Sequence, residues 1–555
     1  MRTSAMVLLC VLCALAALTC LKTTAVNGAG LPAESDPNAV CAPCHQAIVD
    51  RYTTTPMANA SGPANAGFVP GDFRHSASGV SYRVSGEAGR VWLSFERQSH
   101  SRPLDGRRQL LYFIGSGKRG RTYLFEEQGY WFESPINWYA KQRVWDMAPA
   151  FQSVREMPLT LPVDPGCLHC HASAVASSLP EARNRYAREP FAAGGITCEA
   201  CHGNADAHLA SAGRIHMLQI DRLEPVRRDS ICLNCHLEGQ AAINREGKRP
   251  EDYRPGDDLF DSSLFFVRRG ENGSGGRATS QWEALLKSAC KRKSGDRLTC
   301  TTCHDPHGDP APDQRIAFYR QKCLQCHDQN GFAQRHHVEN PDCTACHMGR
   351  PASNDIAHEQ VTDHWIKRHA GNERLPLATT GDLVSVGGVH AGDRDRGLAY
   401  AQLAASGDKP AALRALELLH KAEKESEIAR SDHEAHTQLG FLEQLNGNKD
   451  QAAAEYREAL AADPDDSVAA GNLAFIEAQD HHLAEAAGLW REVFAHDPTE
   501  IDAGFNLAIL ECGAGERAST VQILDRILQF SPDNDRARTM AAEIQNGTRA
   551  CARSR

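Results

Sequence analysis

The sequence has no excess of basic residues and, after its first 21 residues, no apolar run long enough to span a membrane. Its 60 Lys and Arg residues against 70 Asp and Glu give a formal net charge of -10, which excludes the basic surface that nucleic-acid binding requires. Hydrophobic residues at 41% and charged residues at 23% are typical of folded globular chains, not of disordered or membrane-embedded ones. At 555 residues the chain is too long for one core, so several domains are expected.

The N-terminal residues 1–26 have the pattern of a secretory signal peptide. Arg2 precedes an apolar stretch over residues 5–21, and small residues follow it. The apolar stretch is near the lower limit for crossing a bilayer, so an uncleaved N-terminal anchor that stops at Lys22 is the alternative. Either way the sequence predicts an exported protein, located in a bacterial periplasm.

Twenty cysteines are unusual in a chain of this size, and most of them belong to one repeated motif, Cys-x-x-Cys-His. The seven copies are Cys41-Ala-Pro-Cys44-His45, Cys167-Leu-His-Cys170-His171, Cys198-Glu-Ala-Cys201-His202, Cys232-Leu-Asn-Cys235-His236, Cys300-Thr-Thr-Cys303-His304, Cys323-Leu-Gln-Cys326-His327 and Cys343-Thr-Ala-Cys346-His347. Two sulfur atoms three residues apart on a helical turn reach the two vinyl-derived carbons of one haem, while the adjacent imidazole binds the iron.

Zinc sites or disulfides are the alternative explanation for paired cysteines, but neither requires His after every second Cys. The sequence therefore predicts seven covalently bound haem c groups, each attached through the two cysteines of its motif. The seven motif histidines are the expected proximal iron ligands. Cys290, Cys512 and Cys551 lie outside the motifs; Cys512 is expected in a helix core, and pairing of the other two stays open.

A sixth ligand on each iron, or an open position, decides between an electron carrier and an enzyme. The candidate distal ligands are His307, His208, His336, His337, His358, His364, His75 and Met57. His307 follows His304 by about one helical turn, where it could reach a neighbouring iron. Met57 would raise the potential of the first haem relative to two histidines. For each candidate, a packing or surface role is the alternative.

Three regions of different composition and sequence pattern predict a multidomain fold. Residues 38–160 hold the first motif and a β-rich insert, expected as four to six antiparallel strands between glycine-containing turns. Residues 161–370 hold the other six motifs among short irregular helices. This stretch has few Leu, Ile and Val, so we expect haem to supply much of its buried apolar mass.

The third region, residues 394–546, is rich in Ala and Leu, and its sequence repeats with a period of 34 residues. Pro464, Pro498 and Pro532 mark the period, which is that of tetratricopeptide repeats. An all-α solenoid is expected, with clear units at about 433–466, 467–500 and 501–534, a degenerate unit before them and a capping helix after them. Asn472 and Asn506 occupy equivalent positions and are candidates for contacts with a protein partner.

These motifs resemble those of exported multihaem cytochromes of the cytochrome c-552/4 type that carry tetratricopeptide repeats. The segments that carry the resemblance, besides the first motif, are Thr55-Pro56-Met57-Ala58, Gly115-Ser-Gly117-Lys118-Arg119-Gly120, Ser134-Pro135-Ile-Asn-Trp138-Tyr139, Gly195-Ile-Thr-Cys198-Glu-Ala-Cys201-His202-Gly203 and Thr362-Asp363-His364-Trp365-Ile366. The chain is also similar to the superfamily of hydroxylamine oxidoreductase and octahaem reductases, which implies closely stacked haems. Catalytic members with a Lys-ligated haem carry Cys-x-x-Cys-Lys, which this sequence lacks.

The leading hypothesis is therefore a periplasmic heptahaem cytochrome that passes electrons along stacked haems and docks redox partner proteins through its repeats. The alternative is a reductase or oxidase of a small nitrogen or sulfur compound at one open haem. A third possibility gives the repeats the main role, as a scaffold whose haems are structural or sensory.

Overall fold

The computed structural model describes residues 37–99, 102–149, 151–179, 182–186, 190–269, 281–336, 339–350, 362–368 and 381–552. By internal contacts the chain divides into two units, residues 1–37 and 38–555, and the features below belong to the second. The expected signal segment 1–26, together with His337 and His358, lies outside the described residues. Within the described ranges, no helix combines the length and the apolar character needed to cross a membrane.

The β-rich region forms one antiparallel sheet of ten strands in the order β10-β11-β7-β6-β5-β4-β3-β2, with β1 beside β5 and β8 beside β7. The strands are β1 (Ser61–Pro63), β2 (Gly71–Arg74), β3 (Ser81–Glu87), β4 (Arg90–Arg97), β5 (Leu104–Ile114), β6 (Gly120–Glu127), β7 (Tyr130–Tyr139), β8 (Val144–Met147), β10 (Ser178–Leu179) and β11 (Ala182–Tyr186). The antiparallel pairing matches the expectation, but the sheet is larger than four to six strands. It also extends past residue 160, because Arg185 of β11 pairs with Tyr130 of β7.

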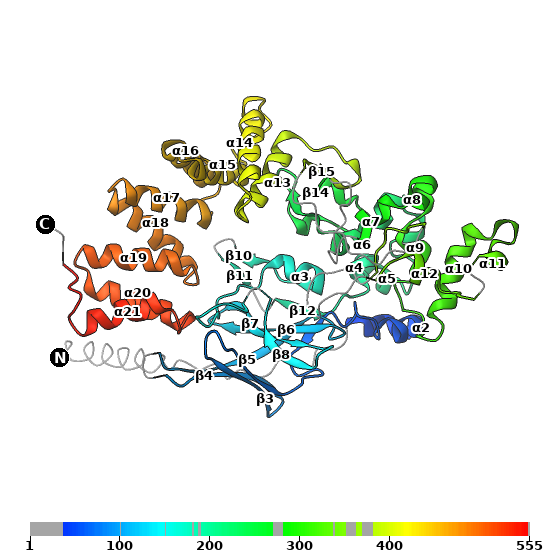
Figure 1. Cartoon of the computed structure of the whole chain (residues 1–555), viewed down its shortest axis with the longest axis horizontal. Coiled ribbons are helices and arrows are strands. Elements are labelled where there is room, and N and C mark those ends of the chain that lie inside the picture. Colours follow the sequence, from blue (N-terminus) through cyan, green and yellow to red (C-terminus); the bar gives the residue numbers. More distant parts are fainter. Residues whose placement is uncertain are drawn as a thin grey trace, which may run out of the picture. The chain divides into compact units, whose positions relative to one another are not determined.

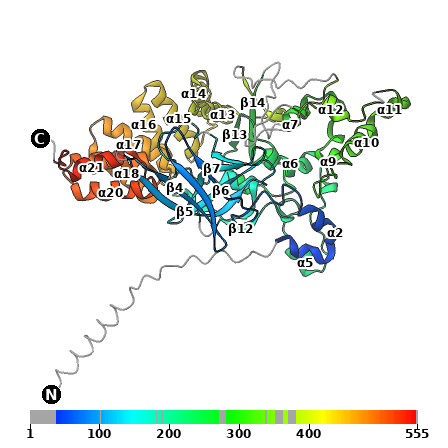
Figure 2. The same ribbon diagram turned by 60° about the horizontal axis from the view of Figure 1, so that its bottom comes forward.

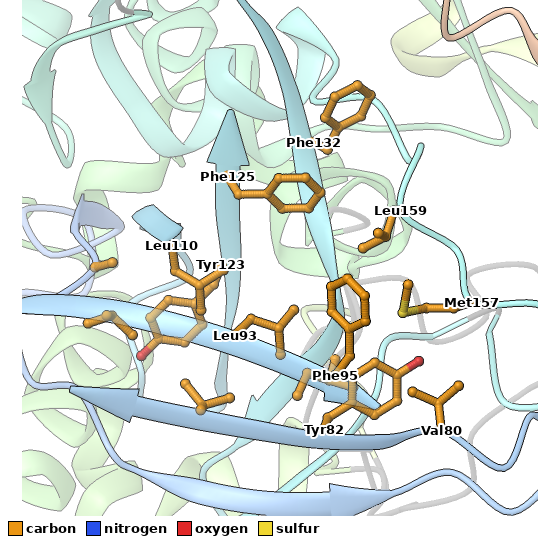
Figure 3. Close-up of a cluster of buried hydrophobic side chains, with 14 of the residues drawn as sticks. Val80, Tyr82, Leu93, Phe95, Leu110, Tyr123, Phe125, Phe132, Met157 and Leu159 are labelled. Atoms are coloured by element: carbon orange, nitrogen blue, oxygen red, sulfur yellow. The ribbon is translucent and has the colours of Figure 1, made fainter. Parts of the chain in front are cut away.

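Alternating side chains build the core of this sheet. Along β4, buried residues alternate with less buried ones, as expected for a strand with one face on a core. Figure 3 shows Tyr82, Leu93 and Phe95 gathered with the aromatic rings of Tyr123 and Phe125 in one apolar cluster. The expected turn between β5 and β6 is a hairpin in which Gly115 has a φ of 96°, a value that a side chain would strain.

The motif-bearing region consists of short helices and two small sheets. The helices are α2 (Ala42–Tyr52), α3 (Pro165–His171), α4 (Glu199–His202), α5 (Asp206–Ala210), α6 (Pro225–His236), α7 (Gln281–Lys287), α8 (Ala289–Ser294), α9 (Cys300–Cys303), α10 (Arg315–His327), α11 (Phe332–Arg335) and α12 (Cys343–His347). The sheets pair β9 (Ala172–Val175) with β12 (Phe191–Gly194), and join β13 (Ala241–Asn244), β14 (Ser263–Arg268) and β15 (Leu383–Ser385).

The motif helices bury little of their own surface. Helix α10 is 13 residues long and contains no buried residue, and the same is true of α4, α5, α9 and α12. A helix of that length normally buries an apolar stripe against a neighbour. These helices therefore need apolar surface that their own side chains do not supply.

The C-terminal region is an all-α solenoid of antiparallel helix pairs (Figure 1). Its helices are α13 (Asp393–Ala405), α14 (Lys409–Lys424), α15 (His433–Asn446), α16 (Lys449–Ala462), α17 (Ser467–Gln479), α18 (Leu483–His496), α19 (Ile501–Gly513), α20 (Arg517–Phe530) and α21 (Asp535–Gln545). Helices α15 to α20 form the three clear units, α13 and α14 the degenerate one, and α21 follows as a capping helix. Gly440 allows this close packing, since a Cβ there would lie 2.6 Å from the Tyr456 ring.

The solenoid packs against the rest of the unit near both of its ends. Residues of α13, among them Leu398, share a core with Ile243 and Phe266 of the three-stranded sheet. Phe530 of α20 belongs to the core of the ten-stranded sheet. Beside it, the fully buried Asp533 carboxylate pairs with Arg97 of β4.

Candidate haem-binding sites

Polar caps start several of the motif helices. Asp164 accepts a hydrogen bond from the Gly166 amide at the start of α3, where Pro165 occupies the first helical position. Asp342 accepts from the amides of Thr344 and Ala345 at the start of α12. Such caps satisfy amides that a short helix leaves free, so each cysteine pair and its histidine lie on a defined turn.

Four of the candidate distal ligands lie opposite motif histidines, with their ring centres about 6 Å apart. His45 and His208 have ring centres 6.4 Å apart and an interplanar angle of 22°. The same arrangement occurs at three more sites, namely His202 with His307 (5.9 Å, 13°), His304 with His364 (6.2 Å, 33°) and His336 with His347 (5.9 Å, 28°). Both ribbon views place α5, which carries His208, beside α2, which carries His45 (Figures 1 and 2).

The spacing of these four pairs fits a single iron held between two imidazoles. With a metal–nitrogen bond of about 2 Å on each side, two imidazole ring centres on opposite sides of one metal lie roughly 6 Å apart. All four pairs have this separation, with interplanar angles between 13° and 33°. The residues present therefore fit a haem c group at each pair, with cysteines for attachment and an imidazole on each face.

Backbone carbonyls fix the outer nitrogen of several of these rings. His208 Nδ1 lies 2.8 Å from the Ile215 carbonyl oxygen, and His364 Nδ1 lies 2.9 Å from that of Thr362. His347 Nδ1 lies 2.6 Å from the Lys367 carbonyl oxygen. A metal-bound histidine usually donates its second N–H in this way, which leaves Nε2 as the nitrogen that faces the metal.

Burial favours the neutral form of the paired rings. Burial, with the nearby His304 ring, lowers the pKa of His364 to about 4. Burial also lowers the pKa of His202 and of His304. A neutral imidazole is the form that binds a metal, and at neutral pH these rings are already in that form.

His75 and Met57 lie elsewhere. Both ring nitrogens of the buried His75 are engaged inside the sheet region, Nδ1 with the Ser78 hydroxyl at 2.8 Å and Nε2 with the Gln152 carbonyl at 3.0 Å. We therefore leave His75 out of the ligand set. The Met57 carbonyl oxygen accepts a hydrogen bond from the amide of Ile196, a residue just before the third motif. The residue that lies opposite His45 of the first motif is His208, not Met57.

Sulfur atoms of different motifs lie close together. In the structure they are thiols, which stand for the sulfur atoms of haem thioethers. The thiol of Cys170 of the second motif interacts with that of Cys235 of the fourth, and Cys232 of the fourth interacts with Cys300 of the fifth. Cys323 of the sixth motif interacts in the same way with Cys343 of the seventh. The second, fourth and fifth motifs thus lie together, and so do the sixth and seventh.

Sequence reasoning missed the residues that hold the distal histidines in place. The Ser288 hydroxyl donates to the His364 carbonyl oxygen at 3.0 Å and accepts from the Ile366 amide at 2.8 Å, which anchors residues 362–368. Asp305 lies beside His307, and Arg51 of α2 pairs with it at 2.5 Å. The contact between Asp305 and His307 could have been expected from the sequence, because the two residues are only two positions apart. The role of Ser288 could not, because its partners are distant in sequence.

Comparison with known proteins identifies two segments of the chain. Residues 292–332 match the doubled CXXCH motif family, and residues 139–203 match the family of cytochrome c554 and c-prime. Both matches support a multihaem c-type cytochrome with covalently bound haem. No curated protein matches the sequence.

The repeats are similar to solved structures of low sequence identity. A crystal structure of MamA protein is 16% identical, with a TM-score of 0.25, and the match covers 28% of this chain and 82% of that one. A tetratricopeptide repeat protein from Parabacteroides merdae is 17% identical, with a TM-score of 0.25, and the match covers 28% of this chain and 61% of that one. The repeat fold itself rests on the helix pairs and their 34-residue period.

Proposed function

We propose that this protein is an exported heptahaem electron-transfer cytochrome whose repeat domain binds redox partner proteins. The four facing histidine pairs are the observation that carries the proposal. An iron with an imidazole on each face has no free position for a substrate, so it exchanges electrons without binding one. The first, third, fifth and seventh motifs would be of this closed type.

The proximity of the motifs suggests the order in which electrons move. Side-chain interactions connect Cys232 with Cys300 and Cys323 with Cys343. Electrostatic interactions between His45 and His202, Cys201 and Cys232, and Cys303 and Cys326 indicate that these residues also lie near one another. They define a path from the first motif through the third, fourth, fifth and sixth to the seventh. The second motif contacts the fourth through Cys170 and Cys235, so it forms a side branch.

Solvent exposure suggests where electrons enter and leave. Cys44 of the first motif and Cys326 of the sixth are exposed, whereas the other motif cysteines are partly buried. An exposed attachment cysteine brings a haem edge within reach of a partner protein. These two positions lie at or near opposite ends of the path, as an electron carrier between two partners requires.

The repeats supply a surface for such partners. Val468, Phe475 and Ile509 are 57%, 45% and 44% exposed, and Phe475 and Ile509 occupy the same position in successive units. Asn472, expected to contact a partner, is half-buried beside Tyr456 within the domain. We therefore assign the partner contact to the exposed apolar side chains rather than to Asn472.

Export is supported by a disulfide. Cys512 and Cys551 form a disulfide that links α19 to the C-terminal segment. Disulfides persist in oxidising compartments such as the bacterial periplasm. Together with the predicted signal segment, this bond favours a periplasmic location.

The test is a haem count by pyridine haemochrome combined with the electron paramagnetic resonance spectrum of the oxidised protein. Seven haems, all low-spin, are expected. A stoichiometric high-spin signal would instead favour the alternative function, a reductase or oxidase with one open haem. Fewer than seven haems would contradict the assignment of every motif as an attachment site.

A further inference from the structure

One of the distal histidines faces a carboxylate. His307 Nδ1 lies 3.5 Å from Asp305 Oδ1, and the same oxygen accepts the His307 amide at 2.9 Å. In contrast, His208 and His364 direct Nδ1 at backbone carbonyl oxygens. His307 therefore has a different electrostatic environment on the side away from the third motif.

A cation lies on the other side of the same carboxylate. Arg51 Nη2 is 2.5 Å from Asp305 Oδ2, and both side chains are partly exposed. Arg51 also covers the turn that follows His307, since a Cβ on Gly308 would lie 3.3 Å from its guanidinium nitrogens. Asp305 is thus held between the Arg51 guanidinium and the His307 imidazole.

We propose that Asp305 and Arg51 together set the reduction potential of the haem at the third motif. The negative charge of Asp305 beside His307 Nδ1 lowers this potential, and Arg51 limits that effect. The inference rests on the pairing of His307 with His202 in the proposed function. It concerns positioning and electrostatics only, since no bond is made or broken at Asp305 or Arg51.

The direction of each effect follows from ligand basicity. The negative charge of a carboxylate close to the outer nitrogen of a bound imidazole makes that imidazole a stronger electron donor than a neutral carbonyl does. A stronger donor stabilises the oxidised iron and lowers its potential. Arg51 competes for the carboxylate charge, so its removal leaves more negative charge acting on His307.

The two residues can be separated because their removal has opposite effects. Asp305→Asn keeps the shape of the side chain and removes its charge, and Arg51→Gln removes the competing cation. We would follow a redox titration of the haem-loaded protein by electron paramagnetic resonance. The low-spin signal of the third-motif haem should titrate at a higher potential in Asp305→Asn and at a lower potential in Arg51→Gln than in the wild type. A tenfold change in the ratio of oxidised to reduced haem corresponds to about 59 mV for one electron.

Two further variants make the outcome unambiguous. Asp309 lies in the same loop as Asp305, but its carboxylate pairs with Lys118 at 3.9 Å. Asp309→Asn should therefore shift the low-spin signal of the third-motif haem much less than Asp305→Asn does. His307→Ala should convert the same haem to high-spin. If it does not, the His202–His307 pairing and that part of the proposed function fail. If it does, but Asp305→Asn and Arg51→Gln leave the signal in place or move it in the same direction, only the present inference is wrong.

Discussion

At the scale of single residues, two features mark a distal histidine such as His208 or His364. Its ring centre lies about 6 Å from that of a motif histidine, and its outer nitrogen is hydrogen-bonded to a backbone carbonyl oxygen. His208 has both, with His45 opposite and the Ile215 carbonyl behind it. A surface histidine would have neither constraint.

We expect His208→Ala to leave the haem content unchanged and to convert one low-spin haem to high-spin. The thioether cysteines and His45 are untouched, so the haem remains attached, but the sixth position at the first motif opens. Electron paramagnetic resonance checks this result. His216→Ala is the control, because His216 is an exposed histidine nearby; if both variants give the same spectrum, His208 is not the ligand.

At the scale of elements, one buried ion pair joins the end of the solenoid to the ten-stranded sheet. Asp533, whose side chain is 0% exposed, pairs with Arg97 at 8% and with Arg102 at 31%, and accepts the Met157 amide. The Tyr130 hydroxyl adds a bond to the His496 carbonyl at 2.7 Å. This contact holds the last repeat in place without any haem.

Asp533→Ala should lower the free energy of unfolding by about 3–5 kcal/mol, because it leaves Arg97 buried without its partner. Thermal denaturation with fluorescence detection measures the change. The matched control is Asp502→Ala, which removes the exposed Asp502–Arg536 pair of the same repeat. That variant should cost no more than about 1 kcal/mol, as surface pairs do. If both variants lose the same unfolding free energy, the buried Asp533–Arg97 pair stabilises the fold no more than an exposed pair does.

The same pair has a predictable pH dependence. Burial alone would raise the pKa of Asp533, but its bonds to Arg97 and the Met157 amide, and the charges of Arg97 and Arg102, hold that pKa below its ordinary value. The contribution is therefore complete above about pH 4, the ordinary range of Asp, and is lost as the pH falls through the lower folded value. The stability difference between the wild type and Asp533→Ala should shrink only in that acidic range.

The disulfide acts on the end of the same solenoid. Cys551 packs against the core formed by α19 to α21, and its bond to Cys512 restrains the unfolded segment between them. Cys551→Ser should lower the stability of the last repeat by about 2–4 kcal/mol. Dithiothreitol should have the same effect on the wild type, since it reduces a disulfide but does not cleave thioethers. Cys290→Ser, which alters a free thiol, should leave the unfolding curve unchanged.

At the scale of the whole molecule, the regions differ in what holds them together. The ten-stranded sheet and the repeats have extensive apolar cores. Helices α9, α10 and α12 have no buried residue. Folding around the fifth to seventh motifs should therefore depend on haem, whereas folding of the repeats should not.

Limited proteolysis of the protein produced without haem attachment tests this difference. We expect early cleavage within residues 300–350 and a resistant fragment that contains residues 393–545. The haem-loaded protein should resist cleavage in both regions. Mass spectrometry of the fragments identifies the sites, and equal protection of residues 300–350 with and without haem would contradict the prediction.

The sequence by itself determined the features that are local in the chain. Attachment cysteines and proximal histidines lie within five residues of each other, so each motif could be read directly. The all-α repeat fold of the C-terminal region follows from a sequence period of 34 residues. The alternating strands likewise predicted an antiparallel sheet, although not the strands β10 and β11 that join it from beyond residue 160.

Only the tertiary structure decided which distant residues meet. The sequence named His208 and His307 as candidate ligands, but nothing local shows that they lie opposite His45 and His202. His75 had the same appearance but lies inside the sheet with both nitrogens bonded. The physical reason is that a distal ligand, a buried ion pair and a disulfide each need two groups at a fixed distance in space, and that distance depends on how the whole chain folds.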